Sequence, residues 1–543
     1  MSQLIEHNLL SILVFLPLAT VTLLVLGQPW GRLSDLTWKV VAFVTSLIGF
    51  ALSLELWSRF DTSVGKVQFV EHVEWIPDYG ITYYMGVDGI SLFLVVLTSF
   101  LLPIILLASW TEITKRVREY IFFMLALQTG MLGAFLSLNM FLFYLFWEAM
   151  LIPMYFVIGI WGGPRRIYAT IKFFIYTMVG SLLMLVGILV LAYLHYAQFG
   201  VLTFDYFGVG EATGILDTQI LSDGAPWWQT QGWLFGAFAL AFAIKVPMFP
   251  FHTWLPDAHV EAPTPGSAVL AGVLLKLGTY GFVRYALPLF PQAVLDLSSW
   301  VIALSCVGIV YGALVAMVQT DVKKLVAYSS VSHMGFIVLG TFALNPQGLQ
   351  GSILQMVNHG ISTGALFILV GMLYERRHER EITAFGGIGH VMPIFSAFFL
   401  VTTLSSIGLP ALNGFVGEFL ILLGAFAASP GAAVVATTGV ILSAAYMLWM
   451  VRRVFFGPVV HEVNLRLSDL SAREKLVAAV LVIPMVWIGV YPASFLTPMS
   501  ASVDELLRTM EERGADISAH NGGQSLLAWI EDREPPEPEG SAE

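Results

Sequence analysis

Four ionisable residues lie inside or beside long apolar runs, where a charged side chain is costly and usually has a function. They are Glu148, Lys245, Lys276 and Glu418. Burial makes the ionised form of each group unfavourable, so each can exchange a proton with water or a neighbouring group. Two acids and two bases buried in one chain suggest a pathway along which charge moves. Some of these residues also have an alternative without proton transfer. Lys245 and Lys276 could extend to the membrane interface, and Glu148 could be a protonated acid that is hydrogen-bonded to a neighbouring helix.

Two histidines extend this set of candidates. His333 occurs in Tyr-Ser-Ser-Val-Ser-His-Met-Gly and His359 in Met-Val-Asn-His-Gly-Ile-Ser-Thr, so hydroxyl groups accompany both rings. A neutral imidazole donates one hydrogen bond and accepts another, so it can pass a proton along side chains and water. A histidine whose hydrogen bonds are satisfied within the core is the alternative. We include both histidines among the predicted proton-transfer residues.

The composition predicts a polytopic membrane protein. The 543 residues are 57% hydrophobic and 12% charged, with a mean hydropathy of +0.79, whereas a soluble domain averages about 25% charged residues. Apolar runs long enough to cross about 30 Å of hydrocarbon recur along the chain. We count about fourteen such spans, near residues 4–27, 37–58, 86–109, 119–137, 139–160, 172–196, 232–255, 262–287, 297–317, 325–343, 351–374, 391–427, 431–455 and 475–495.

Two of these spans are interrupted. Pro247 and Pro250 lack amide hydrogens, which leaves the carbonyls of Ala243 and Val246 without their usual helical partners. In a membrane such backbone is tolerated only where it is buried in protein or lines a wet cavity. Glycine and proline also interrupt residues 405–418. Corresponding broken helices in two halves of a transporter indicate an inverted repeat, although proline and glycine are also common in membrane helices.

We therefore predict an all-α polytopic membrane protein of about fourteen transmembrane helices. Spans four to eight and nine to thirteen would form two inverted five-helix repeats, each with a broken helix. The predicted units are residues 1–110 (spans one to three), 111–290 (first repeat), 291–460 (second repeat), 461–500 (span fourteen) and 501–543 (a polar acidic tail, partly disordered because its proline and glutamate content cannot bury a core).

Lysine and arginine mark cytoplasmic loops. Here they follow alternate spans, at Arg32 and Lys39, Lys115–Arg118, Arg165–Lys172, Lys323–Lys324, Arg376–Arg380 and Arg452–Lys475. The intervening loops are nearly free of bases, with Arg59, Lys66 and Arg284 as exceptions. This pattern predicts that both termini lie on the non-cytoplasmic side.

Other kinds of site have little support in the sequence. The single cysteine, Cys306, excludes cysteine-ligated iron–sulfur clusters and an internal disulfide. No dinucleotide-binding motif, P-loop or Cys/His metal spacing occurs. For His252 and His259, structural hydrogen bonds or loop gating are favoured over a metal. No basic stripe with interleaved aromatic residues supports nucleic-acid binding. The chain is expected to hold no cofactor or metal, so any electrons travel elsewhere.

Four sequence blocks carry a resemblance to a known family. They are Phe146–Phe156, Lys245–His259, Asp321–Gly335 and Gly414–Phe419. The chain resembles the antiporter-like membrane subunits of respiratory complex I, the NADH–quinone oxidoreductase, over about residues 85–460. Subunits L and N and stand-alone antiporters typically carry lysine at the position of Glu418, whereas the subunit M family carries glutamate.

The resemblance implies roles for the candidate residues. Glu148 and Lys245 would form an ion pair, Lys276 would be the central relay, and Glu418 would be the terminal proton carrier. Weakening the pair would push a proton toward Lys276, then toward Glu418 and the outer face. His333 and His359 would help to complete this route.

The resemblance also implies an enzymatic context. The chain would be a proton-translocating subunit in the bacterial inner membrane, driven by electron transfer from NADH to quinone. NADH, FMN, iron–sulfur clusters and quinone would be bound by partner subunits, and antiporter-like subunits L and N would be neighbours in the lipid bilayer. The alternatives are a cation/proton antiporter subunit of a multisubunit antiporter or membrane-bound hydrogenase, and a scaffold that only anchors other subunits.

Overall fold

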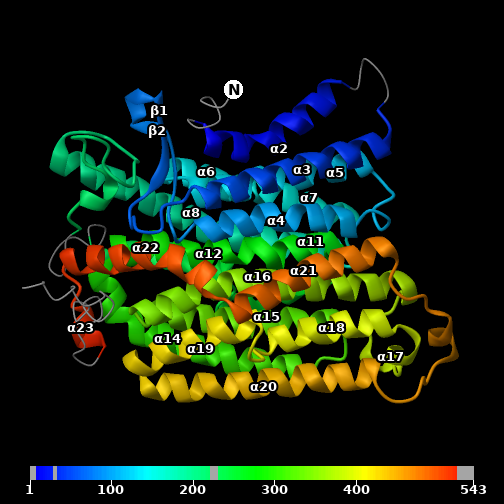
Figure 1. The fold of residues 1–543 in the computed structure, drawn as a ribbon. Helices are drawn as coiled ribbons and strands as arrows, with labels where there is room; N and C mark the ends of the chain where they lie inside the picture. Colours follow the sequence, from blue (N-terminus) through cyan, green and yellow to red (C-terminus); the bar gives the residue numbers. More distant parts are fainter. Residues whose placement is uncertain (1–7, 28–32, 221–229, 522–543) are drawn as a thin grey trace, which may run out of the picture.

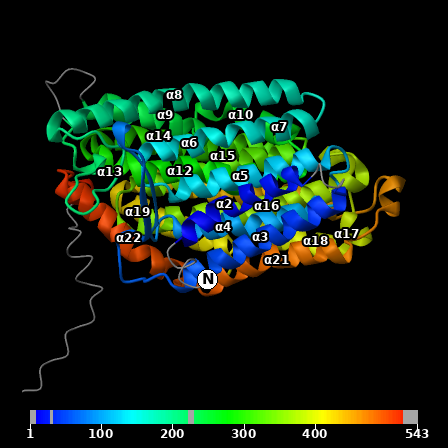
Figure 2. The same ribbon diagram turned by 90° about the horizontal axis from the view of Figure 1, so that it is seen from above.

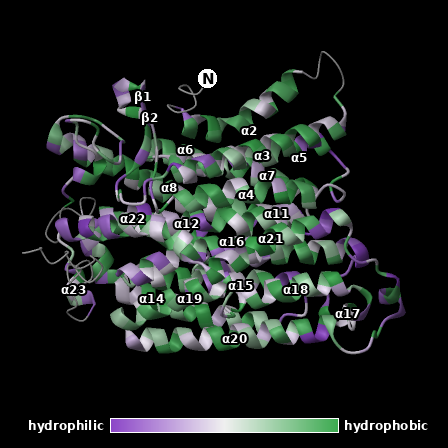
Figure 3. Ribbon diagram, viewed as in Figure 1, coloured by the Kyte–Doolittle hydropathy of each residue, from purple (hydrophilic) through white to green (hydrophobic). Residues whose placement is uncertain are grey.

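The computed structural model describes residues 8–27, 33–220 and 230–521. Within these residues, the long helices run side by side in one bundle (Figure 1 and Figure 2). Ten helical segments are long and apolar enough to cross a membrane, or eleven when the bent pair α21 and α22 is counted as one span. Hydrophobic residues dominate the middle of the bundle, and hydrophilic residues gather mainly at its two ends (Figure 3). The predicted helical membrane protein is confirmed at this level.

The helices follow the predicted apolar runs along the chain. The first group is α2 (Leu9–Leu26), α3 (Asp35–Ser58), α4 (Leu92–Ala108), α5 (Val117–Leu136), α6 (Met140–Ala149), α7 (Leu151–Trp161) and α8 (Arg166–Phe199). The central group is α9 (Gln231–Lys245), α10 (Trp254–Glu261), α11 (Thr264–Val269), α12 (Leu275–Gly281), α13 (Leu287–Leu289), α14 (Pro291–Met317), α15 (Val322–Phe342) and α16 (Pro346–Arg377). The last group is α17 (Ile388–Val391), α18 (Pro393–Ser406), α19 (Asn413–Ala428), α20 (Pro430–Phe455), α21 (Ala472–Val490), α22 (Ala493–Glu512) and α23 (Ile517–His520). Short 3-10 turns occur at η2 (Pro77–Tyr79), η3 (Ile215–Asp217), η5 (Phe251–Thr253), η8 (Ile382–Ala384) and η9 (Glu462–Arg466).

The central helices are enclosed by the others. The apolar windows of α16 and of the segment Thr264–Leu289 are completely buried, and that of α15 is 94% buried. In contrast, the windows of α2, α3, α8 and α20 are only 33–39% buried. Peripheral helices therefore present apolar side chains outward, and the central helices hold polar groups away from lipid.

A β-hairpin is the main departure from the all-α prediction. Strand β1 (Gln68–Ile76) pairs antiparallel with β2 (Ile81–Val87). Gly80, at the end of the turn, has φ +63°, and a Cβ there would lie 2.1 Å from the Leu202 carbonyl oxygen. The amide of Leu138 donates to the Tyr84 carbonyl at 2.8 Å, which joins the hairpin to the start of α6. A search for long apolar runs does not detect such strands, because their polarity varies from residue to residue.

The span from Thr264 to Leu289 contains two π-helical turns that the sequence analysis missed. They are η6 (Leu270–Leu274) and η7 (Phe282–Ala286), on either side of α12. A π turn widens the helix and releases a carbonyl from the regular ladder, and such turns occur frequently at functional sites. Lys276 follows the first turn, and Arg284 lies within the second.

Both predicted helix breaks are present. Between α9 and α10, the amide of Met248 donates to the Ala243 carbonyl at 2.8 Å, in place of the bond that Pro247 cannot make. Between α18 and α19, the amide of Leu409 donates to the Leu404 carbonyl at 3.0 Å. Displaced amides thus satisfy carbonyls of the broken backbone inside the protein.

The C-terminal segment is more ordered than its composition suggests. Helix α22 crosses the boundary predicted at residue 501 and buries Val503, Leu507 and Met510. The side chain of Asn521 donates to the Leu344 carbonyl at 3.0 Å. The last dozen residues, for which disorder was predicted, lie outside the described part of the chain.

Candidate functional site

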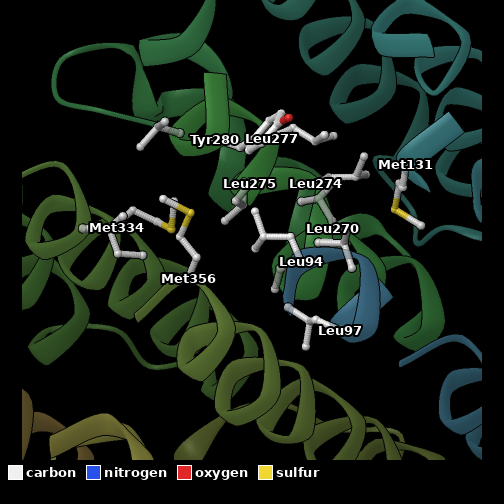
Figure 4. Close-up of a cluster of buried hydrophobic side chains, with 14 of the residues drawn as sticks. Leu94, Leu97, Met131, Leu270, Leu274, Leu275, Leu277, Tyr280, Met334 and Met356 are labelled. Carbon is white, nitrogen blue, oxygen red and sulfur yellow. The ribbon is translucent and has the colours of Figure 1, made fainter. Parts of the chain in front are cut away.

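Lys276 is completely buried and has two polar partners. Its Nζ contacts the Ala271 carbonyl, which belongs to the π turn η6, and lies 2.7 Å from His359 Nδ1. The residues on either side of it in sequence, Leu275 and Leu277, belong to a cluster of buried hydrophobic side chains that also includes Met356 of α16 (Figure 4). The π turn therefore supplies an acceptor, and the surrounding apolar side chains exclude bulk water.

A close approach of two helices brings Lys276 and His359 together. A Cβ on Gly360 of α16 would lie 2.7 Å from the Gly272 carbonyl oxygen of η6. Only residues without a side chain allow the two backbones to come so near. Because Gly360 follows His359 directly, this contact fixes the distance from the imidazole to the lysine.

Gly360→Ala is expected to force α16 away from η6. Overpacking of this kind costs about 1–3 kcal/mol, so the unfolding temperature of the purified protein should fall. Gly364→Ala is the matched control one turn along α16, because its Cβ would meet Leu101 at an ordinary 3.9 Å. Equal unfolding temperatures for the two variants would contradict this account.

His333 and Glu418 form a second buried pair. His333 Nδ1, on α15, lies 2.8 Å from Glu418 Oε1, on α19. Gln355 of α16 also donates to Glu418 Oε1, at 3.1 Å. The Glu418 carboxyl is thus held between a titratable ring and an amide, both inside the protein.

The two buried pairs meet at the histidines. The ring centroids of His333 and His359 are 5.9 Å apart, and both rings line a cavity of about 10 Å³. That volume corresponds to about one water molecule. Within the described part of the chain, the Nε2 atoms of both rings and Asn358 Oδ1 are buried without a hydrogen-bond partner. Each histidine therefore uses Nδ1 for one charged residue and leaves Nε2 free beside the shared cavity.

The structure brings together four of the six predicted residues in one row, which we call the central row: Lys276, His359, His333 and Glu418. Three further residues line the cavity between them and were not predicted from the sequence: Gln355, Asn358 and Ser362. Their positions on α16, three to four residues apart along one helical face, were the available signal.

Glu148 and Lys245 lie apart from this row. Lys245 is 1% exposed, and its Nζ lies 5.2 Å from the ring centroid of Trp147 and 5.9 Å from that of Phe173. Neither Lys245 Nζ nor Glu148 Oε1 has a hydrogen-bond partner among the residues that the structure describes, although Glu148, which is half-buried, also interacts with Ser181 and Tyr144. The two charges interact electrostatically, but no ion pair within 4.0 Å joins them. The implied ion pair is open in this structure.

His259, near the first break, lacks the structural hydrogen bonds that were one of its two predicted roles. The residue is completely buried, and neither of its ring nitrogens has a hydrogen-bond partner among the described residues. Its ring instead stacks on Phe367, with centroids 4.6 Å apart. Structural hydrogen bonding is therefore wrong for this ring, whereas loop gating stays a prediction. Among the described residues, no group of three or more His, Cys, Asp or Glu side chains could hold a metal ion.

One end of the bundle gathers the basic loops. Arg376 of α16 pairs with Glu474 at 2.7 Å, and Lys323 donates to the Ala262 carbonyl at 2.6 Å. Glu112, in the loop before α5, accepts a hydrogen bond from the Thr264 amide at 3.1 Å. Burial raises the pKa of Glu112. Ionisable groups are therefore concentrated at this end of the bundle.

Comparisons with known proteins agree over nearly the whole chain. Residues 137–443 match the family model described as NADH:quinone oxidoreductase/Mrp antiporter, transmembrane, and residues 9–134 match the amino terminus of NADH-ubiquinone oxidoreductase chain 4. The NADH-quinone oxidoreductase subunit M of Rhodobacter capsulatus is 47% identical over 507 residues, which cover 92% of this chain and 97% of that relative. Chain 4 of the NADH-ubiquinone oxidoreductase of Marchantia polymorpha is 43% identical over 503 residues, 92% of this chain and 97% of the relative.

Solved structures show the same fold. A chain of respiratory complex I from Thermus thermophilus with bound NADH superposes with a TM-score of 0.80 and 32% identity, covering 92% of this chain and 99% of that one. A chain of the Mrp complex from Dietzia sp. also gives a TM-score of 0.80, over 94% of this chain and 99% of that chain. Its identity is 19%, so this second likeness concerns the fold alone.

Proposed function

Because the chain belongs to the subunit M family of NADH–quinone oxidoreductase, we propose that its central row carries protons across the membrane. The chain is an antiporter-like membrane subunit of a proton-translocating enzyme complex. The alternative of a cation/proton antiporter subunit is not favoured, since the closely similar relatives are complex I subunits. The observation that carries the proposal is the arrangement of the two histidines between Lys276 and Glu418.

Each imidazole would receive a proton at one nitrogen and release another proton from the opposite nitrogen. Lys276 gives a proton to His359 Nδ1, and the ring releases its Nε2 proton to a water in the shared cavity. That water passes a proton to His333 Nε2, and His333 Nδ1 protonates Glu418. The distances of 2.7 and 2.8 Å at the two ends support direct transfer, and the free Nε2 atoms support the step through water.

Glu148 and Lys245 supply protons to this row in our proposal. With the pair open, the two charges still attract each other across the gap. When the pair closes, Lys245 holds its proton more strongly, and when the pair opens, Lys245 holds it less strongly. The opening therefore drives the proton toward Lys276. Each charge moved against 100 mV needs about 2.3 kcal/mol, and electron transfer in partner subunits provides this energy.

The topology that fits this route has fourteen membrane crossings. The support is the set of ten long apolar helices and the bent pair α21 and α22, together with the shorter apolar helices α4 and α9 and the interrupted span formed by α18 and α19, which counts as one crossing. Residues 111–290 and 291–460 would be the inverted repeats, each with one helix break, between residues 1–110 and 461–500. The acidic tail would begin within α22. The basic loops gather at one end, which would face the cytoplasm of a bacterial inner membrane, with both termini on the other side.

The cofactors of the parent complex belong to other subunits in this proposal. Partner subunits would bind NADH, FMN, iron–sulfur clusters and quinone, and subunits L and N would be membrane neighbours. This chain contributes only proton-transfer groups. Mass spectrometry of the purified complex, together with cross-linking from this chain, tests the identity of those neighbours.

His359→Phe tests the central row directly. A benzene ring fills the space of the imidazole but cannot carry a proton, so NADH-driven proton uptake by vesicles containing the complex should fall about tenfold. His195→Phe is the matched control, because His195 is equally buried but hydrogen-bonds to Val201 and Thr213 outside the row. Unchanged uptake in an assembled His359→Phe complex would refute the proposed route.

A further inference from the structure

A further buried charge pair, which we call the outer pair, joins Arg284, which lies in the same span as Lys276, to Asp88, which precedes α4. Arg284 Nη2 contacts Asp88 Oδ1, and the two residues are 5% and 3% exposed. Arg284 Nε also donates to the hydroxyl of Tyr280 at 3.2 Å, and that hydroxyl donates to the Phe135 carbonyl at 3.0 Å. The proposed proton route uses none of these groups.

The outer pair is connected to the central row by one helical segment. Lys276, Tyr280 and Arg284 are spaced four residues apart, which places them near one another along a helix. Tyr280 lies between the two cations, and Arg284 sits in the π turn η7. Polar groups therefore extend from Lys276 toward the end of the bundle that holds the β-hairpin.

A large cavity lies beyond the outer pair. It measures about 980 Å³ and is lined by described residues of the hairpin, the segment 206–220 and α22, together with Asp88 and Arg284 themselves. In the proposed topology this end faces the outer side of the membrane. The outer pair is nearly buried yet borders the cavity, so it separates this outer cavity from the polar groups around Lys276.

We propose that the outer pair is an electrostatic seal that keeps protons on Lys276 from escaping to the outer cavity. This inference rests on the proposed function of the central row. A guanidinium remains charged and does not carry protons. Fixed in a low-dielectric site, it repels an approaching proton, as arginine does in pores that exclude cations. A proton on Lys276 is thereby directed through His359.

Asp88 positions the arginine. Its Oδ1 accepts hydrogen bonds from the amides of Ile90 and Ser91, at 3.0 and 3.1 Å, at the start of α4. The carboxylate is thus anchored to backbone before it meets Arg284. A flexible partner would let the guanidinium turn into the outer cavity and open the seal.

Passive proton flux tests the seal without NADH. Vesicles containing the complex and a trapped pH indicator are given an external acid jump, and internal acidification is followed. Arg284→Gln should raise the flux about tenfold, which corresponds to a barrier lower by about 1.4 kcal/mol. Arg284→Lys, which keeps the charge, should stay close to the unaltered complex. If Arg284→Gln does not assemble, Asp88→Asn is used. Its amide oxygen can still accept from the Ile90 and Ser91 amides, but it no longer holds Arg284 by charge, so the flux should rise in this variant too, and an unchanged flux would overturn the proposal.

Two further variants separate a seal from a structural contact. Arg376→Gln removes the largely buried pair with Glu474 at the opposite end of the protein and should not raise the flux. Adding Lys276→Met to Arg284→Gln should return the flux to its original level, because the leak passes through Lys276. Unchanged flux in assembled Arg284→Gln, an equal rise in Arg376→Gln, or a leak that persists in the double variant would overturn the proposal. The passive-flux assay needs no electron transfer. Its result therefore supports or contradicts the seal independently of the His359→Phe test, which concerns the central row.

Discussion

Glu418→Gln is expected to reduce NADH-driven proton uptake by about 100-fold. Glutamine keeps the size of the side chain and can still bond to His333 and Gln355, but it has no proton to exchange. The central row then ends at His333, and a proton arriving there has no acceptor. Because oxidation is coupled to translocation, the rate of NADH oxidation by the reconstituted complex should fall as well. Both rates are measured on vesicles with equal amounts of assembled complex.

Glu418→Asp is the matched control. Aspartate retains a titrating carboxyl but is shorter by one methylene, so the 2.8 Å contact with His333 lengthens. Most of the uptake should survive. Similar activities for the Gln and Asp variants would show that hydrogen bonding, and not titration, is the role of this residue.

The sequence allowed the members of the central row to be predicted, but not their pairing. An ionisable side chain within an apolar run is costly to bury, and this cost alone identifies a lysine, a glutamate and two histidines as candidates. Which of them meet depends on contacts between residues 83 and 85 positions apart, from Lys276 to His359 and from His333 to Glu418. Helical periodicity gives the face on which a side chain lies, but not the neighbouring helix that it meets.

Local backbone features were harder to predict for a different reason. Proline identified the break after Lys245, because its ring forbids a regular helix. No residue type marks the π turn η6, and an apolar stretch such as Leu270–Leu274 is equally compatible with an α-helix. The turn depends on packing, including the close contact of Gly272 with α16. The tertiary structure thus determines where Lys276 finds its carbonyl partner.

The open Glu148–Lys245 pair changes how its role is understood. Family resemblance implied a formed pair, but the structure shows a lysine held by aromatic rings and a carboxylate oxygen without a partner. Lys245 is the buried member of the pair, and a buried ammonium group without a hydrogen-bond partner is unstable by several kcal/mol. Such a site favours either closure of the Glu148–Lys245 pair or loss of the proton from Lys245. A proton-transfer step that alternates between holding and releasing a proton can use both states.

Lys276→Met is expected to stop proton translocation while leaving the protein folded. Methionine has a similar length and no charge, and the neighbouring residues Leu275 and Leu277 belong to a cluster of buried hydrophobic side chains (Figure 4). Replacing a buried charge by an apolar residue is often neutral or stabilising, whereas the unpaired Nδ1 of His359 costs about 1–3 kcal/mol. We therefore expect the stability to change by no more than about 2 kcal/mol, with uptake reduced about 100-fold. Thermal unfolding and NADH-driven uptake are measured on the same preparation.

Two substitutions make this prediction specific to proton exchange. Lys276→Arg keeps the positive charge but cannot release a proton at physiological pH, so it should be as inactive as Lys276→Met. Lys39→Met removes a lysine that donates to the carbonyls of Trp110 and Ile113, far from the row in sequence, and should leave uptake unchanged. Activity in Lys276→Arg would mean that a fixed charge suffices at this position. The lysine would then act as an electrostatic element, and the proton would have to cross the protein by another path.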